Sequence, residues 1–307
     1  MLNNADILIT GGTGSWGHEL AKQLFGYTSS ITIMARNESN LVKMSREHPQ
    51  YNYMIGDVRD YATVEDAISR HSKVFHLAAI KHVPICETQP HEAIETNIRG
   101  SENIVKACNK WKREAVLVST DKAVEPVNTY GISKAMAEKL FLHSGHKVIR
   151  AGNVIGSSGS VIPLFSEQIK NNESITLTHE DMTRFFMTLP QAIHLVLNAY
   201  YQCSPGDIGI IKMPSFKLTD IAYTLAGTTD YPIDIIGIRP GEKLHEVLIS
   251  EAEIPDTYWD PTYNMYIVTK YPKKAWVNVI DKYSSKNVTH DMEELKKLLA
   301  DAGYLNF

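Results

Sequence analysis

The sequence predicts an α/β protein whose main part is a doubly wound parallel sheet, with a smaller second domain attached. Short apolar runs rich in β-branched residues alternate with amphipathic stretches through the first half of the chain, which is typical of a parallel sheet covered by helices. A glycine-rich turn follows the first of these runs. With 307 residues, 43% of them hydrophobic and 21% charged, the chain can bury a large core and has the composition of a globular protein.

Six apolar runs are predicted to be strands of this sheet. They are Asp6–Thr10, Ile31–Ala35, Tyr53–Ile55, Val74–Leu77, Ala115–Ser119 and Val148–Ala151. Parallel strands need long crossover connections, and the amphipathic stretches between the runs are expected to supply them as helices. These stretches include His18–Phe25, Val64–Arg70, Glu92–Trp111 and Thr129–His143.

The turn after the first strand reads Gly11-Gly-Thr-Gly-Ser-Trp-Gly17 and leads into the first predicted helix. Glycines are needed there because side chains would block the tight turn and the approach of backbone N–H groups to a pyrophosphate at a helix N-terminus. In this position the motif predicts a Rossmann-type site for a nicotinamide dinucleotide. The residues expected to contact the cofactor are Gly11, Thr13, Gly14, Ser15, Trp16 and Gly17.

The end of the second strand reads Ala35-Arg36-Asn37. An NAD site usually has an acidic residue near this position, to accept hydrogen bonds from the ribose hydroxyls. Arg36 instead suits a 2′-phosphate by its charge and its planar fork. We therefore expect NADP, with NAD as the alternative, and take Arg36 and Asn37 as candidate cofactor contacts.

Tyr130 and Lys134 lie four residues apart behind Asn128, which is a candidate helix cap. This spacing puts both side chains on one face of the helix that begins there. A lysine ammonium beside a tyrosine hydroxyl favours the phenolate and so makes the tyrosine a usable base. The pair is therefore a candidate catalytic pair.

Thr120, Asp121 and Lys122 follow the predicted strand Ala115–Ser119, at the edge of the sheet where ligands bind in open α/β folds. Successive strand residues point to opposite faces, so the chain is expected to turn here if the three are to act together.

These motifs resemble the extended branch of the short-chain dehydrogenase/reductase superfamily. Related sugar 4,6-dehydratases carry Thr-Asp-Glu where this chain has Thr120-Asp121-Lys122, and the Thr-Asp-Lys form resembles the UDP-N-acetylglucosamine 4,6-dehydratases. Further blocks extend the resemblance over most of the chain: Ile80-Lys81-His82-Val83-Pro84, Glu95-Thr-Asn97-Ile-Arg-Gly100, Arg150-Ala-Gly-Asn153-Val-Ile-Gly156, Met182-Thr-Arg184-Phe-Phe and Ile238-Arg239-Pro-Gly-Glu242-Lys243.

The resemblance implies further site residues. Additional cofactor contacts would be Asp57, Val58, Leu77, Ala78, Ala79 and Lys81. Residues that hold the UDP-sugar would be Lys81, Asn153, Arg184, Arg239 and Glu242. The arginines would face the diphosphate, which suits their fork geometry.

The chemistry implied is oxidation of a sugar at C4, loss of water across C5 and C6, and return of hydride to C6. Tyr130 would take the C4 hydroxyl proton, Asp121 would be the acid for the C6 hydroxyl, and Lys122 the base at C5. Lys122 must then be neutral, and lowering its pKa by about 3 units costs roughly 4 kcal/mol. This role requires either a protonated Asp121 or a geometry that separates the two side chains.

Tyrosine at position 130 favours the C5-inverting group, which resembles the enzyme that starts pseudaminic-acid synthesis. The product would be UDP-2-acetamido-2,6-dideoxy-L-arabino-4-hexulose. Three alternatives stay open: a C5-retaining dehydratase, a nucleotide-sugar C4 epimerase or reductase, and a cofactor-binding scaffold without catalysis.

The chain is expected to divide into a dinucleotide-binding domain, residues 1–153 plus roughly 184–213, and a substrate domain, residues 154–183 plus 214–307. The apolar stretch Thr188–Tyr200 is expected to pack on the first domain. A net charge of -4 gives no reason to expect nucleic acid or an anionic membrane as partner.

Three unpaired cysteines predict neither disulfides nor a metal site, and the chain lacks a leader-like or membrane-spanning apolar stretch. We therefore expect a cytoplasmic protein, and by resemblance a homo-oligomer associating through helices near Tyr130.

Overall fold

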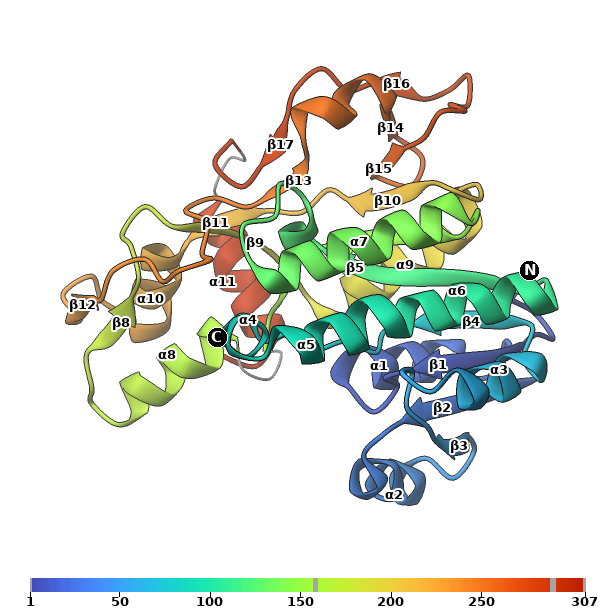
Figure 1. Cartoon of the computed structure of the whole chain (residues 1–307). Coiled ribbons are helices and arrows are strands. Elements are labelled where there is room, and N and C mark those ends of the chain that lie inside the picture. Colours follow the sequence, from blue (N-terminus) through green and yellow to red (C-terminus); the bar gives the residue numbers. More distant parts are fainter. Residues whose placement is uncertain (1, 157–159, 288–290, 306–307) are drawn as a thin grey trace.

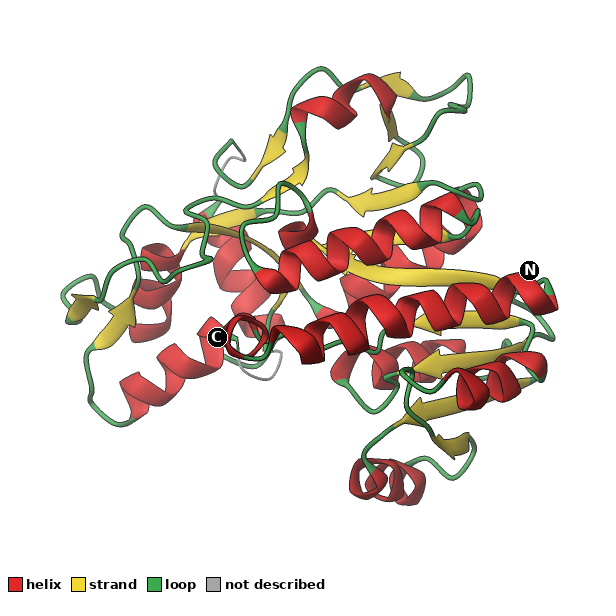
Figure 2. Ribbon diagram, viewed as in Figure 1, coloured by secondary structure: helices red, strands yellow, loops and turns green. Residues whose placement is uncertain are grey.

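The computed structural model describes residues 2–156, 160–287 and 291–305, and its main feature is a ten-stranded sheet (Figures 1 and 2). The strand order is β16-β14-β15-β10-β6-β5-β4-β1-β2-β3. Strands β10 through β3 in this order run parallel, and β15, β14 and β16 continue the sheet in antiparallel fashion. The doubly wound α/β fold predicted from the sequence is confirmed.

The strands of this sheet have the following bounds: β1 Asp6–Thr10, β2 Ser30–Ala35, β3 Asn52–Ile55, β4 Lys73–His76, β5 Glu114–Thr120, β6 Lys147–Ala151, β10 Ile208–Ile211, β14 Thr257–Asp260, β15 Met265–Val268 and β16 Val277–Asn278. The parallel strands β1, β4, β5 and β6 are largely buried on both faces, as expected of a sheet with helices on each side.

Helices cover this sheet on both faces. Their bounds are α1 Ser15–Leu24, α2 Glu38–Glu47, α3 Tyr61–Ser69, α4 Val83–Thr88, α5 Pro90–Ala93, α6 Gly100–Trp111, α7 Thr129–His143 and α9 Leu189–Gln202. Figure 1 shows α3, α6 and α7 side by side in front of the sheet. On the opposite face α9 packs on α1, β6 and β10, which confirms that this apolar stretch returns to the first half of the chain.

The predicted helix Glu92–Trp111 is interrupted by a π-helical segment, Ile94–Arg99, between α5 and α6. Such segments are rare and often occur at functional sites. The side chain of Asn97 in this segment is buried and forms hydrogen bonds with both backbone groups of Ile80, which follows β4. No local sequence pattern indicates this irregularity, because the partner of Asn97 comes from another part of the chain.

Apart from the 3₁₀ helices Asp121–Ala123 and Glu251–Asp256, the remaining elements of the described residues form three small sheets and three α-helices. They are β7 Asn153–Val154, β9 Thr183–Met187 and β11 Ser215–Lys217; β8 Ile175–Leu177 and β12 Ile233–Ile235; β13 Val247–Ile249 and β17 Tyr283–Ser284; and α8 Val161–Lys170, α10 Leu218–Ala226 and α11 Met292–Asp301. Side chains such as Phe165, Phe216 and Leu298 form a second apolar core there, separate from the core of the large sheet.

The predicted division into two domains differs from the sheet topology in one respect. Residues 257–278 were assigned to the smaller domain, but β14, β15 and β16 extend the large sheet, where Met265 and Ile267 join its core. Antiparallel pairing with β10 lets a late segment of the chain add to the edge of the sheet. The two-domain division itself stays a prediction.

Candidate active site

A cavity of about 650 Å³ lies along the carboxyl ends of the central parallel strands. It extends from the glycine turn and the end of β2, past the segments that follow β4 and β5, to the segment after β6. Among the predicted site residues, those that line it are Gly11, Thr13, Gly14, Ser15, Trp16, Gly17, Arg36, Asn37, Val58, Leu77, Ala78, Ala79, Lys81, Thr120, Lys122, Tyr130, Lys134, Asn153 and Arg239.

The glycine turn leaves room for a ligand at the N-terminus of α1. Gly11 has φ +68°, and a Cβ there would lie 2.7 Å from the Cα of Ala78. A Cβ on Gly17 would lie 2.3 Å from the Cα of Gly12, so only glycine lets α1 approach the turn this closely. Gly14 caps the helix without a side-chain hydrogen bond. These residues fit a dinucleotide pyrophosphate, which would bind the open N–H groups of α1.

Arg36 stands at the far end of the cavity with 49% of its side chain exposed, and its Nη1 lies 3.9 Å from Oδ2 of Asp57. Burial raises the pKa of Asp57, but hydrogen bonds and charge from Arg59 outweigh it and hold the pKa below its ordinary value. Asp57 itself is not part of the cavity lining. The side chain of Asn37 accepts a hydrogen bond from the Asn40 N–H and so caps α2.

The segment after β4 is fixed by the π-helical segment described above. Asn97 accepts from the N–H of Ile80 at 2.8 Å and donates to its carbonyl at 2.9 Å. Its amide also donates to Ser133 on α7. The same residue therefore ties the segment that carries Ala78, Ala79 and Lys81 to the helix that carries Tyr130. Burial lowers the pKa of Lys81.

Tyr130 lies in the first turn of α7, which Asn128 caps by accepting from the Gly131 N–H at 2.7 Å. Burial raises the pKa of Tyr130 to about 12, although the charge of Lys122 and a hydrogen bond with Thr120 act in the opposite direction.

Lys134 donates to the carbonyl of Val118 at 2.8 Å, and burial lowers its pKa to about 8. We expected Lys134 to favour the Tyr130 phenolate. In this structure Lys122 is the lysine whose charge acts on Tyr130, while Lys134 donates to the backbone of β5. The catalytic role of the Tyr130–Lys134 pair stays a prediction.

The chain turns after β5, as expected: Asp121–Ala123 form a single 3₁₀ turn. Gly131 makes room for it, since a Cβ there would lie 2.2 Å from the carbonyl oxygen of Lys122. Thr120 accepts from the Lys122 N–H at 3.3 Å and donates to Asp121 Oδ1 at 2.9 Å. This turn brings Asp121 and Lys122 to the same side, with Lys122 Nζ 3.0 Å from Asp121 Oδ1.

The lowered pKa that a base role of Lys122 requires is not found in this structure. Burial does oppose the charged form, but the nearby carboxylates of Asp121 and Glu246 outweigh it and raise the pKa. Burial also raises the pKa of Asp121, while Lys122 acts against that rise.

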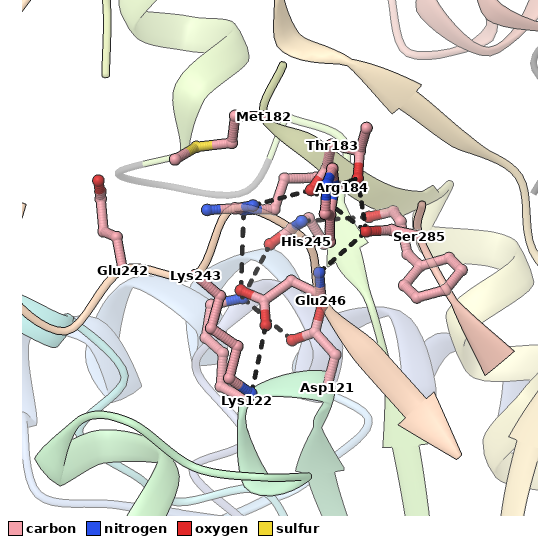
Figure 3. Close-up of polar contacts among 12 residues, drawn as sticks. Asp121, Lys122, Met182, Thr183, Arg184, Glu242, Lys243, His245, Glu246 and Ser285 are labelled. Carbon is pink, nitrogen blue, oxygen red and sulfur yellow. Dashed lines mark hydrogen bonds and ion pairs between the residues drawn. The ribbon is translucent and has the colours of Figure 1, made fainter. Parts of the chain in front are cut away.

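Glu246 is the residue of this site that sequence reasoning missed (Figure 3). It precedes β13 and is buried, and its Oε1 lies 3.4 Å from Lys122 Nζ and 3.7 Å from Arg184 Nε. Its Oε2 lies 3.8 Å from Lys243 Nζ. A glutamate directly before the apolar run Val247–Ile249 was the available signal, since an acidic residue beside a buried strand needs cationic partners.

The predicted substrate residues do not all reach the cavity. Asn153 and Arg239 line it, and Asn153 Oδ1 lies 3.5 Å from Lys122 Nζ. Arg184 instead is outside the cavity lining, and its Nη1 donates to the backbone carbonyls of Thr183 and Leu244. Glu242 is outside the cavity lining and lies 4.0 Å from Arg239.

Within residues 2–156, 160–287 and 291–305, no helix has both the length and the apolar character needed to span a membrane. The same described ranges contain no cluster of three or more histidine, cysteine or acidic side chains arranged to hold a metal ion.

Comparison with known proteins identifies the family. The family model described as polysaccharide biosynthesis protein matches residues 7–268. A UDP-N-acetylglucosamine 4,6-dehydratase (inverting) of Campylobacter jejuni is 41% identical, and the match covers 84% of this chain and 81% of that protein. A UDP-glucose 4-epimerase of Rickettsia bellii is 38% identical over 99% of this chain and 98% of its own.

The solved structure of Pen from Bacillus thuringiensis is similar to this fold with a TM-score of 0.92 at 34% sequence identity, covering 99% of both chains. Since the family model matches most of the sequence and the relatives align over most of their lengths, the chain belongs to the polysaccharide biosynthesis protein family.

Proposed function

We propose that the protein is a 4,6-dehydratase of UDP-N-acetylglucosamine that inverts C5 and recycles NADP. The observation that carries the proposal is the Asp121–Lys122 ion pair beside Tyr130. Lys122 and Tyr130 line the cavity that begins at the glycine turn, whereas Asp121 is buried outside the lining and reaches it through Lys122. The Campylobacter relative supports it. The Rickettsia relative makes a C4 epimerase the second candidate, but an epimerase needs no acid for a C6 hydroxyl.

Each proposed step uses a residue type suited to it. When bound, the dinucleotide would accept a hydride from C4 of the sugar and return it at C6. Tyr130 would take the proton of the C4 hydroxyl, and the resulting carbonyl acidifies the proton at C5. Lys122 would take that proton while the C5–H electron pair forms the C5–C6 double bond. The C6–O bond would break as Asp121 gives its proton to the leaving oxygen, which departs as water. Once the hydride is back at C6, a solvent-derived proton would add to C5 on the face opposite the one that lost it, which completes the inverted product.

Asp121 and Lys122 reach the protonation states needed for this by exchanging one proton. As an ion pair they are carboxylate and ammonium, with Lys122 Nζ 3.0 Å from Asp121 Oδ1. Transfer of a single proton from Lys122 to Asp121 makes a neutral amine, which is a base, and a carboxylic acid. The requirement for a neutral Lys122 is thereby met without a change in the net charge of the buried pair.

NADP rather than NAD is supported by the charges at the far end of the cavity. Arg36 is a half-exposed cation in the cavity lining. The neighbouring carboxylate of Asp57 lies 2.6 Å from Arg59, so it is already engaged. Arg36 itself makes only a long contact of 3.9 Å with Asp57. A cation paired this weakly suits a 2′-phosphate better than a ribose hydroxyl.

The test is to incubate the purified protein with UDP-N-acetylglucosamine in heavy water without added cofactor. We expect loss of water from the sugar, deuterium at C5 and the L-arabino configuration, observed by NMR and mass spectrometry. Mass analysis of the nucleotide released on denaturation should find NADP. Recovery of unchanged substrate, or of a C4 epimer that keeps its oxygen at C6, would overturn the dehydratase proposal.

The proposal includes a homo-oligomer that associates through the helices around Tyr130. The exposed side chains of Ile132 and Met136 on α7 are consistent with such a contact. Light scattering of the purified protein measures its mass in solution.

A further inference from the structure

We propose that Glu246 is a positioning residue for the elimination step: its buried negative charge keeps one proton on the Asp121–Lys122 pair, so that the pair supplies both the acid and the base. This inference rests on the dehydratase function proposed above. Glu246 lies more than a hundred positions after Lys122 in the sequence, and the fold brings the two residues together.

The first observation is the coordination of Lys122. Its Nζ lies 3.0 Å from Asp121 Oδ1, 3.4 Å from Glu246 Oε1 and 3.5 Å from Asn153 Oδ1. Three acceptors around one nitrogen match the three N–H groups of an ammonium. The geometry therefore favours a proton held at this nitrogen in the absence of substrate.

The second observation is that the carboxylates of Asp121 and Glu246 differ in the number of cations that surround them. Glu246 is in contact with the cations of Lys122, Arg184 and Lys243, at 3.4, 3.7 and 3.8 Å. Asp121 has an ion pair with Lys122 alone among the described residues. Two neighbouring carboxylates in unequal surroundings take different protonation states, and the one with more cations is the one that stays ionised. Glu246 is therefore the fixed charge, and Asp121 is the group able to accept the proton.

The third observation is that each carboxylate has one oxygen without a hydrogen bond. Within the described ranges, Asp121 Oδ2 and Glu246 Oε2 are both buried and lack a hydrogen-bond partner. A buried ionised oxygen without a donor is unfavourable. A proton on Asp121 removes this penalty at one of the two oxygens, and it supplies the hydrogen that the departing C6 oxygen needs.

The charge count explains why Glu246 is necessary. Among the described residues of this cluster, three cations, Lys122, Arg184 and Lys243, face two carboxylates. Without the charge of Glu246, Asp121 alone would face three cations. Such an environment favours loss of the shared proton, since it lowers the pKa of every group in it. The pair would then lose its acid at a lower pH.

Polar and charged side chains from several packed elements face the Asp121–Lys122 pair. Thr120 ends β5, Tyr130 belongs to α7, and Arg184 to β9. Lys243 and Glu246 come from the segment before β13, and Lys243 also donates to the carbonyl of Val124 at 2.5 Å. Burial opposes ionisation of Glu246, but the charges of Lys122, Arg184 and Lys243 outweigh it and lower its pKa.

The test compares the pH dependence of dehydration in the wild type, Glu246→Gln and Glu246→Asp. Glutamine keeps the size and one oxygen acceptor but loses the charge, whereas aspartate keeps the charge. We expect both limbs of the bell-shaped kcat profile of Glu246→Gln to move to lower pH by roughly 1–3 units. The Glu246→Asp profile should stay in place with a lower maximum, and KM for the sugar should change little in either variant.

Glu125→Gln is the matched control. Glu125 lies three residues after Lys122, but its carboxylate is exposed and bonded to Lys282 at 2.8 Å. Its removal should leave the profile unmoved because solvent screens the charge. Equal losses of kcat in Glu246→Gln and Glu246→Asp, with both profiles in the wild-type position, would show a merely structural role and overturn the proposal.

A second measurement separates this proposal from the proposed function. The ¹⁵N resonance of the Lys122 side chain, assigned by its absence in Lys122→Arg, can be titrated in the ligand-free protein. Its midpoint should be lower in Glu246→Gln than in the wild type, and an unchanged midpoint overturns the role of Glu246. The wild type could leave UDP-N-acetylglucosamine unchanged while the midpoint still shifts between wild type and Glu246→Gln. In that case the dehydratase function fails, but the effect of the Glu246 charge on the protonation of Lys122 holds.

Discussion

Two clusters of largely buried charge, one around Arg150 on β6 and one around Lys122 after β5, differ in how completely their atoms are paired. The first, which we call the Arg150 cluster, consists of Arg150 on β6, Glu138 on α7 and Glu253. Every guanidinium nitrogen of Arg150 donates to a carboxylate: Nε and Nη2 to Glu138, and Nη1 and Nη2 to Glu253. Nη1 also donates to the carbonyl of Leu248.

The second, the Lys122 cluster, consists of Asp121, Lys122, Arg184, Lys243 and Glu246. Within the described residues, this cluster contains buried carboxylate oxygens that have no hydrogen bond, whereas the Arg150 cluster contains none. A fully paired buried network rigidifies a fold, whereas unpaired buried groups are costly and are found where function requires them. This difference supports a stabilising role for the Arg150 cluster and the catalytic role proposed above for the Lys122 cluster.

The largest expected change in stability follows from Arg150→Met. The substitution leaves the buried Glu138 and the partly buried Glu253 without their cation, so the free energy of unfolding should fall by about 3–5 kcal/mol. Urea denaturation followed by circular dichroism measures this. Lys296→Met removes a cation whose ion pair with Glu293 is exposed on α11, and it should change stability by less than about 0.5 kcal/mol. Equal effects of the two substitutions would contradict the structural role of Arg150.

A smaller loss is expected for Glu253→Gln, and its pH dependence has a definite sign. Burial opposes ionisation of Glu253, but hydrogen bonds and charge from Arg150 outweigh it and lower the pKa below the ordinary value of 4.5. A carboxyl whose pKa is lowered by folding stabilises above its ordinary pKa and loses this contribution as pH falls through the folded value. At pH 7 the variant should be less stable by about 1–2 kcal/mol. The difference from wild type should shrink below pH 4.5, and a difference that is constant with pH would contradict the prediction.

The two clusters also differ in how far the sequence predicts them. The glycine turn and the helix Thr129–His143 were predicted because their signals are local: glycine spacing between strand and helix in one case, and an Asn128 cap before a long helical run in the other. The turn at Asp121–Ala123 was expected from the alternation of strand side chains.

The partners of these local motifs were not predicted, because tertiary packing supplies them. Glu246 reaches Lys122 only because the segment before β13 docks on the start of α7, where Asn128 donates to the carbonyl of Gly241 at 2.7 Å. Arg150 was noticed only within a block of resemblance. An arginine in the apolar strand Lys147–Ala151 indicates a buried ion pair, but no pattern in the sequence identifies Glu253 as a member of it.

Among the substitutions within the two clusters, Asp121→Asn has the smallest expected effect on stability, and its pH dependence has the opposite sign to that of Glu253→Gln. Burial raises the pKa of Asp121 above its ordinary value of 3.8 despite the charge of Lys122. A carboxyl whose pKa is raised by folding binds a proton that the unfolded chain has already lost, so wild-type stability declines as pH rises above that ordinary value.

Asparagine removes this decline. The free energy of unfolding of Asp121→Asn should therefore stay within about 1 kcal/mol of wild type or rise above it, and its advantage should increase between acidic and neutral pH. Turnover should fall by about 10²–10⁴-fold, because the acid for the C6 oxygen is lost. Urea denaturation at several pH values and product formation by NMR measure both quantities. A loss of stability comparable to that of Arg150→Met would place Asp121 among the structural charges, and the distinction between the two clusters would then fail.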